Sequence, residues 1–251
     1  METAKRLLIL VCFASTGYID SPAQNMTPKI VQSYDFMQRV ASANQRNLID
    51  VGRQIPIFPM GQGKKVTELV IDEAWKISSM TLYGSEKLVE GYRVRYDLMA
   101  NAIEFKMPDQ IKVMDAKRVK TLIWLDSTSN IPHYFVNGKD LRFDGVPSTS
   151  LVELVCEGKL NLYKMYTYWV KKADYNPALN VGNIDEKIYI EARFYYGPGP
   201  DLKLVPGKKK EFPAIFGDKA DNVKAYMKEH DLSPSKEAEL SRVFDYYNTL
   251  P

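Results

Sequence analysis

Residues 92–107 read YRVRYDLMANAIEFKM, in which apolar residues alternate with charged ones on both sides of a short turn. This period of two is typical of half-buried β-strands. If Leu98 pairs with Ile103 across an even-length turn, the apolar residues of both strands share one face, whereas a slip by one residue would expose them. The segment therefore predicts an antiparallel hairpin. Its further apolar pairs would be Tyr96 with Phe105 and Val94 with Met107.

The alternating pattern extends from residue 66 to about residue 216 and is interrupted by turn signals. Residues 151–156 and 160–170 flank a Gly158-Lys159 loop that would place Glu153 opposite Lys164. Both faces of these two strands are largely apolar, which is typical of central strands covered on two sides. Further strands are expected at residues 111–113, 119–125, 131–136, 141–143, 188–196 and 202–205.

Near the C-terminus the period changes to that of helices. Asp218 is suited to cap a helix that runs to about His230, and Ser233-Pro234 has the cap and first-position proline of a second helix. The apolar stripe of the second helix is Leu240, Val243, Phe244 and Tyr247. We expect a mainly β (α+β) fold, in which an antiparallel β-meander forms a sandwich or partly open barrel covered by a C-terminal two-helix hairpin.

The first residues have the layout of a secretory signal peptide. Lys5 and Arg6 precede an apolar run at residues 7–14, and Ser21-Pro22-Ala23 has small residues where a signal peptidase cuts. The run is shorter than the roughly 20 apolar residues that span a bilayer. We expect cleavage after Ala23 and a periplasmic or secreted mature chain without a transmembrane segment.

The chain then divides into a signal peptide (1–23), an N-terminal arm or linker (24–65), an antiparallel β domain (66–216) and a helical hairpin packed on it (217–251). Cleavage would remove one of the two cysteines and leave Cys156 without an intramolecular partner, so we expect no disulfide. Stability must then come from a packed core, for which the chain is long enough.

Three blocks of the sequence resemble an uncharacterised family of exported, β-rich bacterial proteins with a C-terminal helical hairpin. The blocks are the hairpin at residues 90–106, the second hairpin at residues 152–164 and the closing helices at residues 223–248. The resemblance covers residues 66–250 and leaves the arm unmatched. It implies the fold and carries over no catalytic residue.

Composition excludes much chemistry. The formal charge of +3 is too even for a dedicated nucleic-acid binder. Only two His and two Cys are present, without the spacing of zinc ligands or of a Ser-His-Asp triad, so we expect no cofactor, no metal and no enzyme activity. Carboxylate chemistry is harder to exclude, but Glu104 beside Arg95 and Glu153 opposite Lys164 are interpreted as solvated cross-strand pairs.

The aromatic residues suggest a surface for a ligand or partner. Tyr166 and Tyr168 share one face of a long strand, Trp169 lies on the other, and His133 shares a strand with Tyr134 and Phe135. Tyr166, Tyr168, Trp169 and His133 are the candidate site residues. We expect a non-enzymatic binding or scaffolding module of the periplasm or cell surface, with a protein, cell-envelope component or glycan as partner.

Two other functions stay open. A carrier of a small apolar ligand requires an apolar cavity of several hundred Å³. A carboxylate-dependent glycan hydrolase requires two carboxylates about 5–10 Å apart in a cleft. Lys208-Lys209-Lys210 is interpreted as a hairpin tip, with contact to an anionic membrane or polysaccharide as the alternative.

Overall fold

The computed structural model describes residues 28–43, 58–59, 69–85, 88–126, 128–129, 131–175, 179–182 and 185–251. The predicted signal peptide and much of the predicted linker lie outside the described residues. Among the helices that are described, none is long and apolar enough to cross a membrane.

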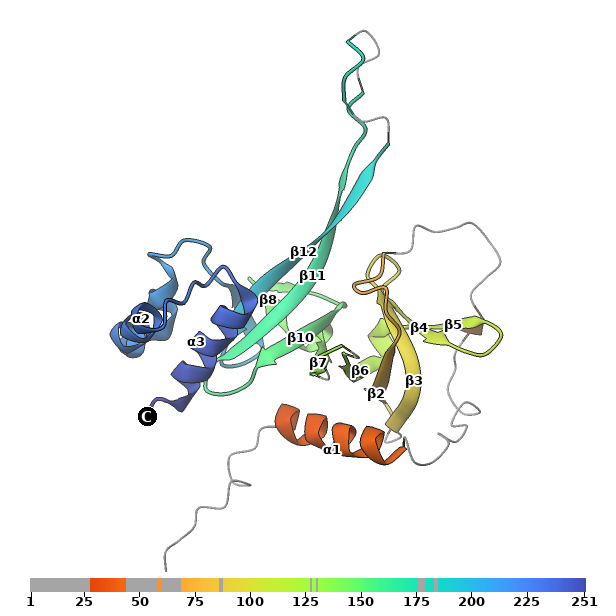
Figure 1. Cartoon of the computed structure of the whole chain (residues 1–251), viewed down its shortest axis with the longest axis horizontal. Helices are drawn as coiled ribbons and strands as arrows, with labels where there is room; N and C mark the ends of the chain where they lie inside the picture. Colours follow the sequence, from red (N-terminus) through yellow and green to blue (C-terminus); the bar gives the residue numbers. More distant parts are fainter. Residues whose placement is uncertain are drawn as a thin grey trace, which may run out of the picture.

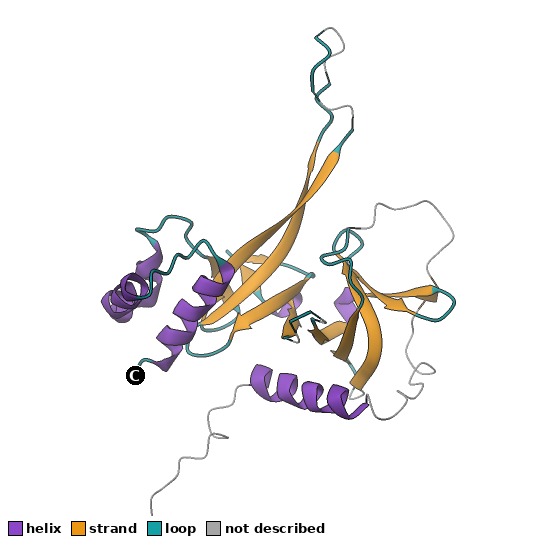
Figure 2. Cartoon of the chain, in the orientation of Figure 1, coloured by secondary structure: helices purple, strands orange, loops and turns teal. Residues whose placement is uncertain are grey.

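The protein is mainly β, with helices at both ends of the described chain (Figures 1 and 2). The strands are β1 (Phe58–Pro59), β2 (Lys76–Leu82), β3 (Leu88–Asp97), β4 (Ala102–Lys106), β5 (Ile111–Asp115), β6 (Val119–Leu125), β7 (Pro132–Asn137), β8 (Arg142–Phe143), β9 (Val146–Pro147), β10 (Leu151–Cys156), β11 (Asn161–Lys171), β12 (Lys187–Gly197) and β13 (Asp201–Leu204). The α-helices are α1 (Pro28–Ala43), α2 (Ala220–Glu229) and α3 (Glu237–Thr249), and the 3-10 helices are η2 (Ala116–Arg118), η3 (Gly138–Asp140) and η4 (Phe212–Lys219).

The strands form one sheet that does not close, in the order β1-β5-β4-β3-β2-β6-β7-β10-β11-β12-β13-β8-β9. Every described pairing is antiparallel except that of β13 with β8. The C-terminal helices pack on this sheet through a cluster of buried residues that includes Leu162, Phe212 and Phe244. The expected fold class is therefore confirmed, as one open sheet covered by helices.

The β3–β4 hairpin forms where the alternation predicts it, but its register differs by two residues. Tyr96 lies opposite Ile103 and Val94 opposite Phe105, because the turn begins after Asp97. The Asp97 carboxylate accepts hydrogen bonds of 2.9 Å from the backbone amides of Met99 and Ala100, which favours a turn that begins directly after Asp97. A shift of two residues keeps the side chains on their faces, so the core is unchanged.

Strands β10 and β11 are covered on both faces, as predicted. Leu154 and Tyr163 lie in a cluster of buried residues that also contains Phe36 of α1. On the opposite face, Cys156 and Leu162 contact the C-terminal helices. The predicted pairing of Glu153 with Lys164 is also present, although a bulge between Leu154 and Cys156 widens the predicted two-residue loop.

The predicted starts of the C-terminal helices are wrong by a few residues. Helix α2 begins at Ala220 without a side-chain cap, so Asp218 is not its N-cap. Helix α3 begins at Glu237, because Lys236 has an extended backbone (φ −108°, ψ 126°). The residues from Ser233 onward form a turn, and the Ser233 amide donates to the Glu239 carboxylate (2.7 Å).

Candidate functional site

Strands β11 and β12 form a long two-stranded ribbon that leaves the body of the protein (Figure 1). They pair over eleven residues, from Asn161 with Gly197 to Lys171 with Lys187. The neighbouring strand β10 pairs with β11 only as far as Lys164, and β13 pairs with β12 only at Tyr195 and Tyr196. The backbone amide of Val205 also donates to the Phe194 carbonyl (2.8 Å). Within the described residues, both outer edges are therefore without a strand partner over residues 165–171 and 187–193, which we call the projecting ribbon.

One face of the projecting ribbon is apolar along its length. Because side chains alternate between faces, the register gives this face three consecutive cross-strand pairs. They are Tyr166 with Ala192, Tyr168 with Ile190 and Val170 with Ile188. The side chains near the middle are well exposed, at 41% for Tyr168 and 39% for Ile190. A contiguous exposed apolar patch makes this face a candidate interaction site.

The opposite face of the projecting ribbon is mixed. Trp169 stacks on Tyr189 with ring centroids 4.5 Å apart and an angle of 18° between the planes. Next to them, Thr167 pairs with Glu191, which forms a 3.2 Å ion pair with Arg193. The two faces therefore differ in polarity, and the apolar face is the stronger candidate for contact with a partner.

At the base of the ribbon a charged cluster continues the apolar face into the sheet. His133 Nδ1 lies 2.6 Å from Glu153 Oε1, and Lys164 Nζ lies 4.0 Å from Glu153 Oε2. Lys164 also donates a 2.6 Å hydrogen bond to Glu237 of α3 and lies over the Tyr166 ring, 4.9 Å from its centroid. The cluster joins three strands to a helix.

The environment of the cluster favours the charged forms of its bases. The hydrogen bond to Glu153 raises the pKa of His133 above its usual value despite burial. Burial alone would lower the pKa of Lys164, but the hydrogen bonds to Glu237 and Tyr166 outweigh it and raise that pKa. These are the electrostatics of a structural ion-pair network, in which each cation lies beside a carboxylate.

A cavity of about 460 Å³ lies beside this cluster, between the sheet and α3. Its lining includes Lys29, His133, Glu153, Glu237 and Ser241. Its lining also includes the apolar residues Ile131, Pro132, Val155 and Ala238, so charged and apolar side chains share the cavity. Glu153 and Glu237 place two carboxylates on this cavity, as a glycosidase would require, and both lie next to the same Lys164 ammonium.

The structure brings together two of the four predicted site residues. His133 and Tyr166 meet the same cluster, and Tyr166 also packs against the core of the sheet. Tyr168 and Trp169 lie farther out, on opposite faces of the projecting ribbon. The sequence analysis missed Ile190, although the alternation at residues 188–196 placed it on an apolar face.

The interpretation of Glu104 and Glu153 as solvated partners is wrong. Glu104 is 1% exposed and Glu153 6% exposed, because the Trp75 ring lies over Arg95 and helix α3 covers Lys164. Alternation in the sequence identifies the face of a strand but not what covers that face. Glu237, the second carboxylate beside Lys164, is 84 residues from Glu153. No local sequence pattern indicates that these two residues meet.

Cys156 is a buried thiol, as its apolar neighbours predict. Burial raises its pKa to about 12, and its sulfur lies 3.2 Å from Ser241 Oγ. A thiol with such a pKa is almost entirely protonated near neutral pH and is a poor nucleophile. Over the described ranges of the chain, no group of three or more His, Cys, Asp or Glu residues could hold a metal ion.

Comparisons with protein-family models, with curated proteins and with solved structures found no match.

Proposed function

We propose that the protein is an exported binding or scaffolding module of the periplasm or cell surface, and that the projecting ribbon is the element that contacts a partner protein. One observation carries this proposal: the ribbon leaves the body with a contiguous apolar face and with two edges that no described strand covers.

A two-stranded ribbon is marginally stable in water on its own. It also exposes backbone N–H and C=O groups along each edge, which is a ready template for another strand. A partner that covers the apolar face removes Tyr168, Val170 and Ile190 from water, and this burial is the main driving force of association. Tyrosine and tryptophan also contribute more than most residues to binding energy in interfaces.

The partner that fits is a protein with an extended segment of alternating apolar residues. Such a segment adds to a free sheet edge by main-chain hydrogen bonds, while its side chains lie over the apolar face. A glycan is a weaker fit, because the aromatic stack of Trp169 and Tyr189 lies on the other face and is only two rings long.

The test is site-specific photocrosslinking followed by an affinity measurement. A photoreactive phenylalanine analogue replaces Tyr168 on the apolar face in one sample and Lys203 of β13 in the other. We expect a protein that crosslinks only from position 168. The same protein, purified, should bind the wild-type chain.

The affinity measurement then compares two double variants. Tyr168→Thr with Ile190→Thr keeps β-forming side chains but removes apolar area, and should weaken binding by about tenfold or more. Thr167→Ser with Glu191→Gln also changes two residues, but on the opposite face of the ribbon, and should change the affinity less than about threefold. Equal affinities for the two variants would refute the ribbon as the contact element.

Export has a separate test. Cell fractionation should place the protein outside the cytoplasm, and N-terminal sequencing of the purified protein should begin at Gln24. A cytoplasmic protein that retains Met1 would refute export and leave the binding role of the ribbon to be judged on the crosslinking result alone.

A further inference from the structure

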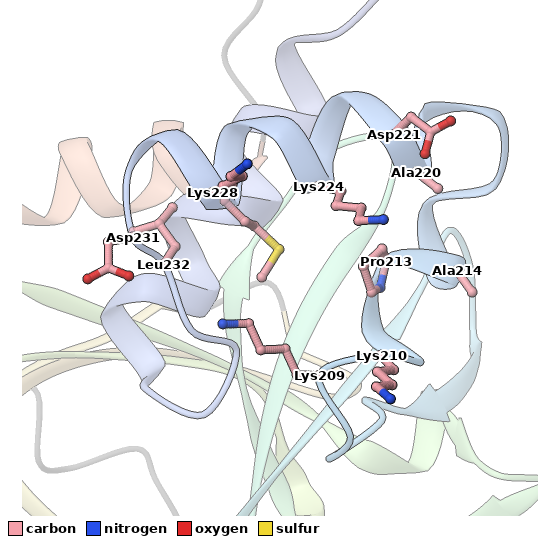
Figure 3. A pocket seen from close by; sticks show the side chains of 11 residues that line it. Lys209, Lys210, Pro213, Ala214, Ala220, Asp221, Lys224, Lys228, Asp231 and Leu232 are labelled. Carbon is pink, nitrogen blue, oxygen red and sulfur yellow. The ribbon is translucent and has the colours of Figure 1, made fainter.

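A second site lies on the C-terminal helices, away from the ribbon. A cavity of about 880 Å³ opens between the loop at residues 206–211 with η4 on one side and α2 on the other (Figure 3). We call it the lysine pocket, since its lining includes Lys209, Lys210, Lys224 and Lys228. Lys209 and Lys224 extend from opposite walls, which the loop and the helix provide (Figure 3).

The lysines of the pocket outnumber the acidic residues of its lining among the described residues. Over the described part of the chain, none of its four ammonium groups forms an ion pair. The neighbouring Lys208 differs, because its Nζ lies 2.9 Å from Glu211 Oε1. The only acidic residues in the lining, Asp221 and Asp231, lie at its two ends (Figure 3).

This arrangement has an electrostatic cost in the free protein. Lys224 and Lys228 are four residues apart on α2, where like charges repel. Lys209 and Lys210 add two more positive charges from the facing wall. A concave site with charges of one sign concentrates their field and attracts counter-ions, so a bound anion would relieve the repulsion.

Two apolar side chains in the lining add a second requirement on the ligand. Met227 and Leu232 line the cavity and are themselves buried, at 6% and 3% exposed. They add apolar side chains to a lining whose lysines come from the loop and from α2. The volume is that of a small-molecule site, and cations on two facing walls suit a compact anion better than a linear polymer that needs charges in a row.

We propose that the lysine pocket binds a diphosphate-type group: a compact anion with two or more phosphates, joined to an apolar or ring-shaped part that lies on Met227 and Leu232. Lysine suits this ligand because its ammonium is a compact point charge that binds phosphate from several directions. The source is either a soluble phosphorylated compound or the headgroup of a phospholipid. This site goes beyond the proposed ribbon function and does not depend on it.

The first experiment is calorimetric titration of the full chain with inorganic pyrophosphate at low ionic strength. We expect saturable binding of one equivalent that weakens as salt is added, because exposed charges are screened. The double variant Lys209→Gln with Lys224→Gln should weaken the binding by about tenfold or more. All of the substituted side chains are exposed, and circular dichroism will check that the fold is kept.

The matched control removes the same charge outside the pocket. Lys117→Gln with Lys203→Gln, two exposed lysines that do not line the pocket, should change the affinity less than about twofold. If the control weakens binding as much as the pocket variant, the effect is one of net charge and the proposal is overturned. Absence of saturable pyrophosphate binding to the wild-type chain would overturn it as well.

A second experiment distinguishes the two sources of the phosphate. Sedimentation with phosphatidylcholine vesicles that contain a phosphatidylinositol bisphosphate measures binding to a lipid headgroup with more than one phosphate. If the vesicles bind the chain and pyrophosphate displaces them, the pocket accepts a lipid phosphate. If pyrophosphate binds and the vesicles do not, the ligand is a soluble compound. Both outcomes support a phosphate site, whereas vesicle binding that neither pyrophosphate nor the pocket variant reduces would contradict it.

Discussion

The substitution Glu104→Gln measures how much the buried ion pair within β3 and β4 contributes to stability. Arg95 Nη2 lies 2.6 Å and Nε 2.9 Å from Glu104 Oε2, and the two side chains are 9% and 1% exposed. Glutamine keeps the size of the side chain but removes its charge. The guanidinium of Arg95 would remain buried without its main counter-charge.

The expected loss follows from this burial. Breaking one partner of a buried pair costs about 3–5 kcal/mol. We expect the lower end, because Arg95 also lies over the Trp75 ring and 3.8 Å from the exposed carboxylate of Glu73. A loss of about 3 kcal/mol corresponds to a fall in Tm of about 6–12 °C for a chain of this size.

Urea unfolding followed by circular dichroism gives the free energy of unfolding, with thermal unfolding as a second measure. The matched control is Glu191→Gln, which breaks the ion pair with Arg193 on the ribbon surface, where both side chains are nearly half exposed. The control should cost less than about 1 kcal/mol.

Two results would refute this reasoning. One is an equal loss for Glu104→Gln and Glu191→Gln. The other concerns the double substitution Arg95→Leu with Glu104→Leu, which removes both buried charges and should recover much of the stability lost by the single variant. If the double variant were the less stable of the two, desolvation of the remaining charge would not be the cause.

Three further outcomes are expected. The hydrogen bond to Glu153 raises the pKa of His133 in the folded chain. The stability that protonated His133 adds is therefore fully present below its unfolded pKa near 6.5 and is lost as pH rises through the folded pKa. His133→Gln should lower the free energy of unfolding more at pH ~5.5 than at pH ~8.5, and the same loss at both pH values would contradict this. Asn248→Ala removes two hydrogen bonds to the backbone of the turn between β10 and β11 and should cost about 1–3 kcal/mol in urea unfolding, whereas an unchanged midpoint would contradict this role. In a Cys12→Ser chain, a thiol reagent should modify Cys156 much faster in denaturant than in buffer, because burial raises its pKa to about 12; equal rates would mean that the thiol is accessible.

The sequence by itself determined most of the strands, although not β1, β2 or β9, and the direction of their side chains. A period of two specifies which residues share a face, so the β3–β4 hairpin follows from alternation. The pairing of Glu153 with Lys164 follows from alternation together with the position of the Gly158-Lys159 turn. A register error of two residues left every face correct. The apolar stripe of α3 was likewise readable, and Leu240, Val243 and Phe244 are buried as it predicts.

Only the tertiary structure decided what covers each face and each edge. Strand β11 is longer than its neighbour β10, with eleven residues against six. The length of the exposed ribbon is nevertheless set by the positions at which β10 and β13 stop pairing with β11 and β12. The charged cluster needs Glu237 from a distant helix, and the lysine pocket needs a loop to face α2. Burial depends on long-range contacts, whereas periodicity reports only the local backbone. For that reason the alternating pattern predicted that Glu104 and Glu153 are solvated, although both are buried in the structure.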